Sequence, residues 1–310
     1  MLKGLAITPP VVGRISIGRI VEKNGKRLPA KDDQFTITTQ VQTRDGWLLH
    51  PQDDVQRKVH GGDKLRAIDI QLPFNAPDLN LRAEYSYFDR EDGRPICVGN
   101  GETCRRESNE GMQTMSCPSP DHCGFHNRDC KPYGRLYVVI GDQDELGTFV
   151  LRTTSYNSIR TLAARMRYFH AVSGGLLACM PLELRLRGKS TAQSFRTAIY
   201  YVDLVVASGT TLEDAIKEAQ RRDARRKEAG FDQAALDEVA HYGFANGSFE
   251  ESVEDVPAVV EEFFPDQQTD GATSEATSTT PTIPSLATKL KARTGQLATI
   301  EKRGVDASLN

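Results

Sequence analysis

Four cysteines in one short, turn-rich stretch carry the clearest chemistry of this sequence. Twelve, five and six residues separate Cys104, Cys117, Cys123 and Cys130, and the residues between them are mostly polar. Such a stretch has too little apolar side chain to order itself by burial. Four thiolates can bind Zn²⁺ tetrahedrally at about 2.3 Å, and such an ion stabilises small loop-rich units. We therefore predict one structural zinc ion bound by these four cysteines.

Disulfides and unconnected thiols are the two alternatives to zinc. Disulfides need an oxidising compartment, and the N-terminal residues MLKGLAITPP lack the pattern of a secretory signal, so we expect a cytoplasmic protein. Five of the six cysteines fall within residues 97–130, which argues against scattered thiols. His122, His126 or Cys97 could replace one ligand, although Cys97 ends an apolar run and fits a buried strand better. A site of four thiolates leaves no position for water, which favours structure over catalysis.

The common catalytic motifs are missing from the sequence. It contains no GxxxxGK[ST] phosphate loop, no GxSxG nucleophile elbow and no HExxH zinc motif. We therefore expect a protein that is not an enzyme and has no small-molecule substrate. No apolar run reaches the 18 or so residues that a membrane-spanning helix needs, so we expect no membrane association.

The elements that must position the cysteines are mainly strands. Short β-branched or aromatic runs, bounded by Gly, Pro, Asn or Asp, recur through the first 208 residues. In the run 182–188, Leu alternates with Glu or Arg, which is typical of a half-buried antiparallel strand. One helix is predicted from about residue 156 to the glycines at 174 and 175, because apolar residues recur there at helical spacing.

The rest of the chain divides into two parts by composition. Residues 209–244 are predicted to form a helical extension, whose first helix begins after Thr211 with acids in its first turn. Residues 245–310, acidic and then rich in Thr and Ser, are predicted to be a disordered tail. Within this tail, Phe263 and Phe264 stand among acids. They could bind a groove on a partner protein, or clip onto the chain's own body.

A net charge of −3 hides a basic region. Residues 151–200 carry eight Arg or Lys against one acid, whereas residues 241–270 carry eight acids and no Arg or Lys. Clustered cations neutralise nucleic-acid phosphates, and the aromatic residues between them could stack on unpaired bases. An ordinary solvated basic face is the alternative. The predicted nucleic-acid contacts are Arg160, Arg167, Arg185, Arg187, Lys189 and Arg196.

The order of residues from the last cysteines onward resembles the recombination directionality factors that phages pair with large serine integrases. That family shows a cysteine-rich loop ending in a C-K-P-x-x-R-L strand, then a glycine, an aromatic-flanked strand and a helix entry. The matching residues here are Cys130, Lys131, Pro132, Arg135, Leu136, Gly147, Phe149, Arg152, Thr154, Tyr156 and Asn157. The resemblance covers about residues 95–190. It implies a protein that binds a serine integrase on DNA and switches it from integration to excision.

Together these observations predict an α+β fold. Residues 1–208 form a mainly antiparallel sheet with one packed helix and a zinc-tied loop at 97–132, followed by the helical extension and the tail. The predicted function is a non-enzymatic DNA-recombination accessory protein of a phage or mobile element, whose partners are a serine integrase or another recombination protein, and DNA. The alternatives are a protein that binds or anneals single-stranded DNA, and a metal-dependent hydrolase.

Overall fold

The computed structural model describes most of the chain up to residue 243 and three residues beyond it. The described residues are 10–23, 26–43, 46–61, 63–89, 93–125, 129–141, 147–190, 198–243, 259–260 and 263. All of them belong to one compact unit, residues 1–265, and the second unit, residues 266–310, lies outside the described part.

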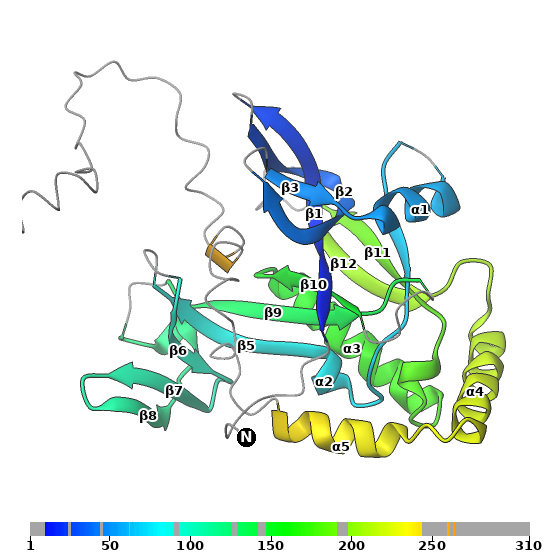
Figure 1. Ribbon diagram of the computed structural model, residues 1–310. Coiled ribbons are helices and arrows are strands. Elements are labelled where there is room, and N and C mark those ends of the chain that lie inside the picture. The colour runs from blue at the N-terminus through cyan, green and yellow to red at the C-terminus, as the bar shows by residue number, and fades with distance from the viewer. Residues whose placement is uncertain are drawn as a thin grey trace, which may run out of the picture. The chain divides into compact units, whose positions relative to one another are not determined.

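Nine strands of the described chain form one large sheet, in the order β3-β2-β1-β10-β9-β5-β6-β7-β8 (Figure 1). All neighbouring pairs are antiparallel except β1 and β10, which run parallel. These strands are β1 (Val11–Lys23), β2 (Lys26–Thr43), β3 (Gly46–Leu49), β5 (Leu81–Phe88), β6 (Pro95–Gly99), β7 (Thr103–Ser108), β8 (Gly111–Ser116), β9 (Lys131–Val138) and β10 (Thr148–Thr153).

A second, smaller sheet is formed by three antiparallel strands of the described chain. Its order is β12-β11-β4, with β4 at Ala67–Ile70, β11 at Leu182–Lys189 and β12 at Ile199–Val206. Leu182, Leu184 and Leu186 are buried on one face, as their alternation with Glu and Arg predicts. This face joins the main core, which also contains Ile15 and Leu136 from the large sheet.

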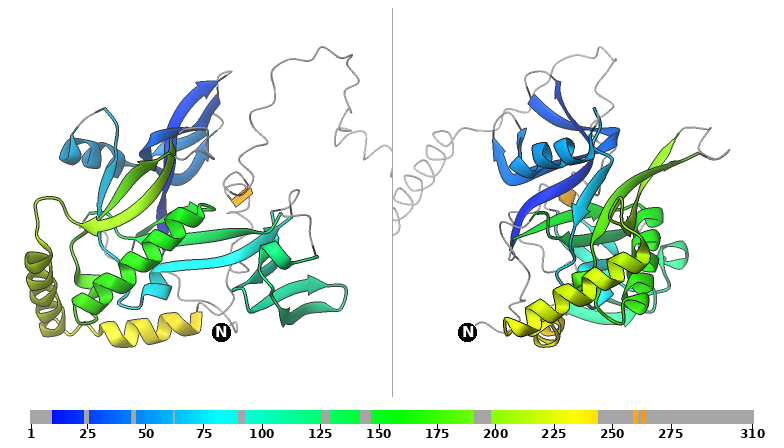
Figure 2. Two further views of the ribbon diagram at one scale, coloured as in Figure 1. Left: turned by 180° about the vertical axis from the view of Figure 1, so that it is seen from behind. Right: turned by 90° about the vertical axis from the view of Figure 1, so that its right-hand side faces the viewer.

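Helix α3 (Tyr156–Val172) covers the core between the two sheets and packs against β12 and β5 (Figure 2). Ser155 caps its first turn, since the side-chain oxygen accepts a hydrogen bond from the Ser158 amide. Leu162, Met166 and Phe169 recur at helical spacing and are buried. The apolar side of the helix therefore faces the main core.

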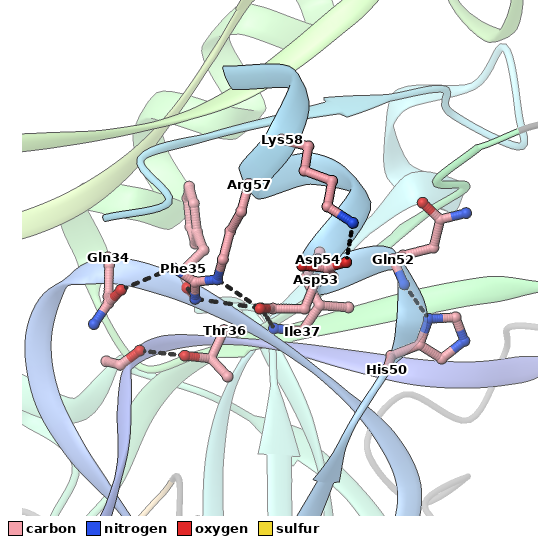
Figure 3. Close-up of polar contacts among 11 residues, drawn as sticks. Gln34, Phe35, Thr36, Ile37, His50, Gln52, Asp53, Asp54, Arg57 and Lys58 are labelled. Carbon is pink, nitrogen blue, oxygen red and sulfur yellow. Dashed lines mark hydrogen bonds and ion pairs between the residues drawn. The ribbon is translucent and has the colours of Figure 1, made fainter. Parts of the chain in front are cut away.

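Helix α1 (Pro51–His60) is fixed on β2 by a buried carboxylate (Figure 3). Asp53 accepts a hydrogen bond of 2.9 Å from the Ile37 amide and pairs with Arg57 at 2.6 Å. Arg57 also donates to the Phe35 carbonyl oxygen and to Gln34. The sequence does not reveal α1 through an apolar stripe, because the buried residues of this helix are polar.

Three more helices complete the described chain. They are α2 (Pro77–Asn80), α4 (Leu212–Glu228) and α5 (Gln233–Gly243). The Thr211 hydroxyl caps α4 by accepting from the Asp214 amide, and Asp237 of α5 accepts from the backbone amides of Asn75 and Ala76. The prediction of an α+β fold with mostly antiparallel sheet is thus confirmed. None of the described helices is long and apolar enough to cross a membrane.

Candidate functional site

The cysteine-rich stretch is largely a hairpin, not the loop that its composition predicted. We call residues 95–125 and 129–130 the cysteine arm; its strands β6, β7 and β8 end the large sheet (Figure 1). Cys97 lies on β6 and Cys104 on β7, whereas Cys117 follows β8 and Cys130 precedes β9. Cys123 follows a 3₁₀ turn at Pro120–His122. The strand pairing, which composition does not reveal, brings distant cysteines towards the base of the arm.

Gly99 shows how closely the thiols gather. A Cβ atom placed on Gly99 would lie 2.6 Å from the Cβ of Cys104 and 2.9 Å from the sulfur of Cys117. Both distances are too short for any side chain, so this position accepts only glycine. Cys97, which precedes Gly99 on the same strand by two residues, is also buried. It is a strand cysteine, as expected, and its thiol lies beside that of Cys104.

The pKa values of two thiols reflect how closely the thiols of the arm lie. Burial raises the pKa of Cys104 to about 11, with a further contribution from Cys97. Burial also raises the pKa of Cys130 to about 12, and the other four thiols of the arm add to the rise. Without a cation these two thiols stay protonated at neutral pH. Arg106 lies near the cluster, with its guanidinium 4.0 Å from the Cys123 sulfur and stacked on Phe125.

Thiolates are suitable ligands for zinc, but no three of the described sulfurs lie as close together as the ligands of one zinc ion do. Sulfurs around a tetrahedral zinc ion lie about 3.8 Å apart, given bonds of about 2.3 Å. No three thiols of the described chain lie within 4.8 Å of one another, and no disulfide joins them. His122 is exposed, and His126 lies outside the described residues.

The predicted basic surface divides into two kinds of cation. Arg165 and Arg187 both pair with the buried Asp203, at 3.1 and 2.6 Å, and Arg185 pairs with the fully buried Glu183 at 2.6 Å. Buried carboxylates need such partners. Arg185 and Arg187 therefore compensate charges of the small sheet, a role that their alternation on the strand did not indicate.

Arg160 and Arg167 are different. Both are exposed on α3, and their side chains make no hydrogen bond or ion pair with the part of the chain that the structure describes. Seven residues apart, they lie on nearly the same side of the helix. Lys189 is exposed and donates to Asn157 at 2.8 Å, and Arg196 lies outside the described residues. Of the five predicted contacts that the structure describes, these two arginines are the most available to a phosphate.

Phe263 lies against the chain's own body. It is fully buried with Phe88 of β5 and Tyr133 of β9, at ring-centroid distances of 4.8 and 6.0 Å. Its carbonyl oxygen accepts a hydrogen bond from Lys131, the residue after Cys130. This is the clip that the sequence left open as an alternative to partner binding. Phe264 lies outside the described residues.

The residues that carry the family resemblance mainly hold the fold. Arg135 is 1% exposed and pairs with Glu84 at 3.2 Å, and Leu136 and Phe149 belong to the main core. Tyr156, in contrast, is exposed at the start of α3. Most of the residues described here that carry the resemblance therefore stabilise the fold beside the arm and do not form a binding surface.

One further group of candidate ligands escaped the sequence analysis. His60, Asp69 and Glu183 have ligand atoms that all lie within 4.8 Å of one another, the only such group in the described chain. They come from α1, β4 and β11. Because 123 positions separate the first residue from the last, no local spacing could have revealed them.

The comparisons with known proteins give one result. A family model described as "Gp3-like: Recombination directionality factor-like" matches residues 12–207. This range covers both sheets, the cysteine arm, α1 and α3. No curated protein and no solved structure matches the chain.

Proposed function

Since the chain belongs to the Gp3-like, recombination directionality factor-like family, we propose that it binds a large serine integrase and switches that enzyme towards excision. The family match carries the proposal, because it spans 12–207 and so includes every element of the two sheets. The chain would act as a non-enzymatic accessory protein of a phage or mobile element. Its effect would come from contact with the integrase, and contact with DNA would assist.

In this proposal the cysteine arm binds structural zinc. The arm has few buried apolar residues, and β8 is mostly exposed, so its strands have little packing to hold them. Five thiols gather at its base. A zinc ion held by Cys104, Cys117, Cys123 and Cys130 would stabilise the arm by coordination, and Arg106 would offset part of the negative charge of four thiolates.

The DNA contact is assigned to α3 and its surroundings. Arg160 and Arg167 lie exposed on one side of this helix, and Lys189 is exposed at the end of β11. Such cations bind phosphates with little sequence preference. They would strengthen the binding of an integrase complex that already sits on its DNA site.

A reconstituted recombination reaction tests the function. The purified chain is added to a large serine integrase from the same element, with integration and excision substrates in separate reactions. We expect the chain to co-elute with the integrase, to promote excision and to suppress integration. An integrase that neither binds the chain nor changes its preferred reaction would overturn the proposal.

The same preparation separates the alternatives. Strong binding to single strands without integrase, together with faster annealing of complementary strands, would favour the single-strand-binding alternative. Turnover of a phosphoester substrate that depends on added metal would favour the hydrolase. The group formed by His60, Asp69 and Glu183 is the observation that makes the hydrolase control worthwhile.

A further inference from the structure

A cavity of about 530 Å³ lies at the edge of the small sheet, far in sequence from the cysteine arm. Its lining includes Gln56 and His60 of α1, Asp69 of β4, Ser208 after β12, and Arg222 of α4. Its volume falls within the range of small-ligand sites, roughly 300–1,000 Å³. Two of its polar lining residues, His60 and Asp69, belong to the group identified above.

His60 and Asp69 face each other in this cavity without a hydrogen bond. The Nε2 atom of His60 lies 3.4 Å from a carboxylate oxygen of Asp69, yet this buried nitrogen has no hydrogen-bond partner in the described chain. Two ligands at about 2.1 Å from a tetrahedral metal ion are themselves about 3.4 Å apart. The two atoms are thus spaced as ligands that share an ion.

Glu183 supplies a second carboxylate beside them. It pairs directly with Asp69 across β11 and β4 and is fully buried. Its oxygens accept from Arg185 at 2.8 Å and from the Ser208 hydroxyl at 2.7 Å, so its position is fixed. Burial raises the pKa of Asp69; the nearby His60 opposes the rise, and the charge of Glu183 adds to it. Two adjacent carboxylates favour a cation near them, and Arg185 already neutralises part of the charge of Glu183.

The surrounding contacts hold the three groups in place. α1 is anchored on β2 through Asp53 and Arg57 (Figure 3), which fixes the last turn of the helix where His60 lies. Gln56 of the same helix accepts a hydrogen bond of 3.0 Å from the Asp69 amide. Arg222, a cation in the lining, is paired with Glu218 at 3.0 Å. The site is therefore built on regular elements, and Arg222 already has a counter-ion.

From this arrangement we propose that His60, Asp69 and Glu183 form a binding site for one first-row divalent cation, distinct from the thiolate zinc site. Imidazole and carboxylate ligands suit Mn²⁺ or Zn²⁺, whereas thiolates select Zn²⁺ and bind Mn²⁺ poorly. The cation would join α1, which packs on the large sheet, to β4 and β11 of the small sheet. It would thereby lock the two sheets together.

Mn²⁺ tests this site more selectively than Zn²⁺, because thiolates such as those of the cysteine arm bind Mn²⁺ poorly. The full chain, purified without chelator, is titrated with Mn²⁺, and binding is followed by the loss of the free-ion EPR signal. We expect one Mn²⁺ per chain and a rise in thermal midpoint on binding. His60→Gln and Asp69→Asn should each weaken binding by about tenfold or more, since even outer-shell partners of a metal typically contribute 10–100-fold.

A matched control uses a similar pair elsewhere on the surface. His241 and Asp78 lie 3.9 Å apart and are well exposed, so Asp78→Asn should leave Mn²⁺ binding unchanged. Asp69 is 46% exposed at its side chain and Asn has the same shape, so the Asp69→Asn variant should fold. Its midpoint without metal verifies this.

Three outcomes would overturn the site. The first is a dissociation constant for Mn²⁺ above about 1 mM, together with no binding of a second equivalent of Zn²⁺. The second is Mn²⁺ binding that survives Asp69→Asn in a folded protein. The third is equal weakening by Asp78→Asn, which would indicate general surface charge. None of these results depends on the integrase experiment.

Discussion

The cysteine arm and the edge of the small sheet could each bind a cation, but they are built in opposite ways. The arm draws its ligands from one continuous stretch, and the residues between them bury little apolar surface. The sheet edge takes one ligand from each of three elements. Two of them, β4 and β11, belong to the main core, and α1 is fixed on β2 by Asp53. A metal in the arm would supply order, whereas a metal at the sheet edge would find order already present. A bound metal ion can thus either create local order or depend on order that the fold already provides.

The first prediction tests the arm's dependence on metal and carries the largest expected effect. Cys123→Ser should remove nearly all of the one equivalent of zinc, measured by elemental analysis of protein purified without chelator. Loss of a ligand from a closed four-thiolate site removes most of the coordination that stabilises the arm. Hydrogen exchange should then accelerate in β7 and β8 but not in β11 and β12.

Two further cysteines sharpen this test. Cys179→Ser is the matched control, because Cys179 lies in the main core, and its zinc content should stay near one equivalent. Cys97→Ser should also retain zinc if the four predicted thiols are the ligands. Loss of zinc from Cys97→Ser would show that Cys97 replaces one of them. Structural zinc sites bind tightly. Wild-type protein with less than about a tenth of an equivalent of zinc would therefore show that the arm is not a structural zinc site.

The second prediction asks whether packing also supports the base of the arm. Phe263→Ala should lower the free energy of unfolding by about 3 kcal/mol, because a fully buried ring against Phe88 and Tyr133 is lost. Chemical denaturation followed by circular dichroism measures this loss. The exposed Phe231 provides the control, and Phe231→Ala should change stability little. A loss as small as that of Phe231→Ala would mean that the clip contributes no stability, leaving metal as the arm's main support.

The third prediction concerns DNA and has the smallest expected effect. If the exposed side of α3 contacts phosphates, Arg160→Ala and Arg167→Ala should each reduce the salt slope of DNA binding by about one unit. The measurement is fluorescence anisotropy over a range of salt concentrations. Arg165→Ala should leave that slope nearly unchanged, because Arg165 already neutralises Asp203. Equal effects from all three variants would mean that Arg165 contacts phosphates in spite of its ion pair with Asp203.

Local patterns predicted much of the architecture. Strands such as β5, β9, β11 and β12 follow from short β-branched or aromatic runs, and α3 follows from its apolar spacing. The same local reading missed α1, whose buried residues are Asp53 and Gln56. Composition also predicted a loop where β7 and β8 pair, because the partner of a strand is invisible to a local window.

The sequence by itself determined that the chain is α+β and that it belongs with the directionality factor-like proteins. It also predicted zinc at four cysteines of one stretch. These features are local, so spacing and order are enough to express them. Only the tertiary structure decided that Arg185 and Arg187 serve buried carboxylates, that Phe263 lies against β5 and β9, and that His60, Asp69 and Glu183 meet. Each of these depends on contacts between residues far apart in the chain. The packing of both sheets around a common core sets such contacts, and no local pattern encodes them.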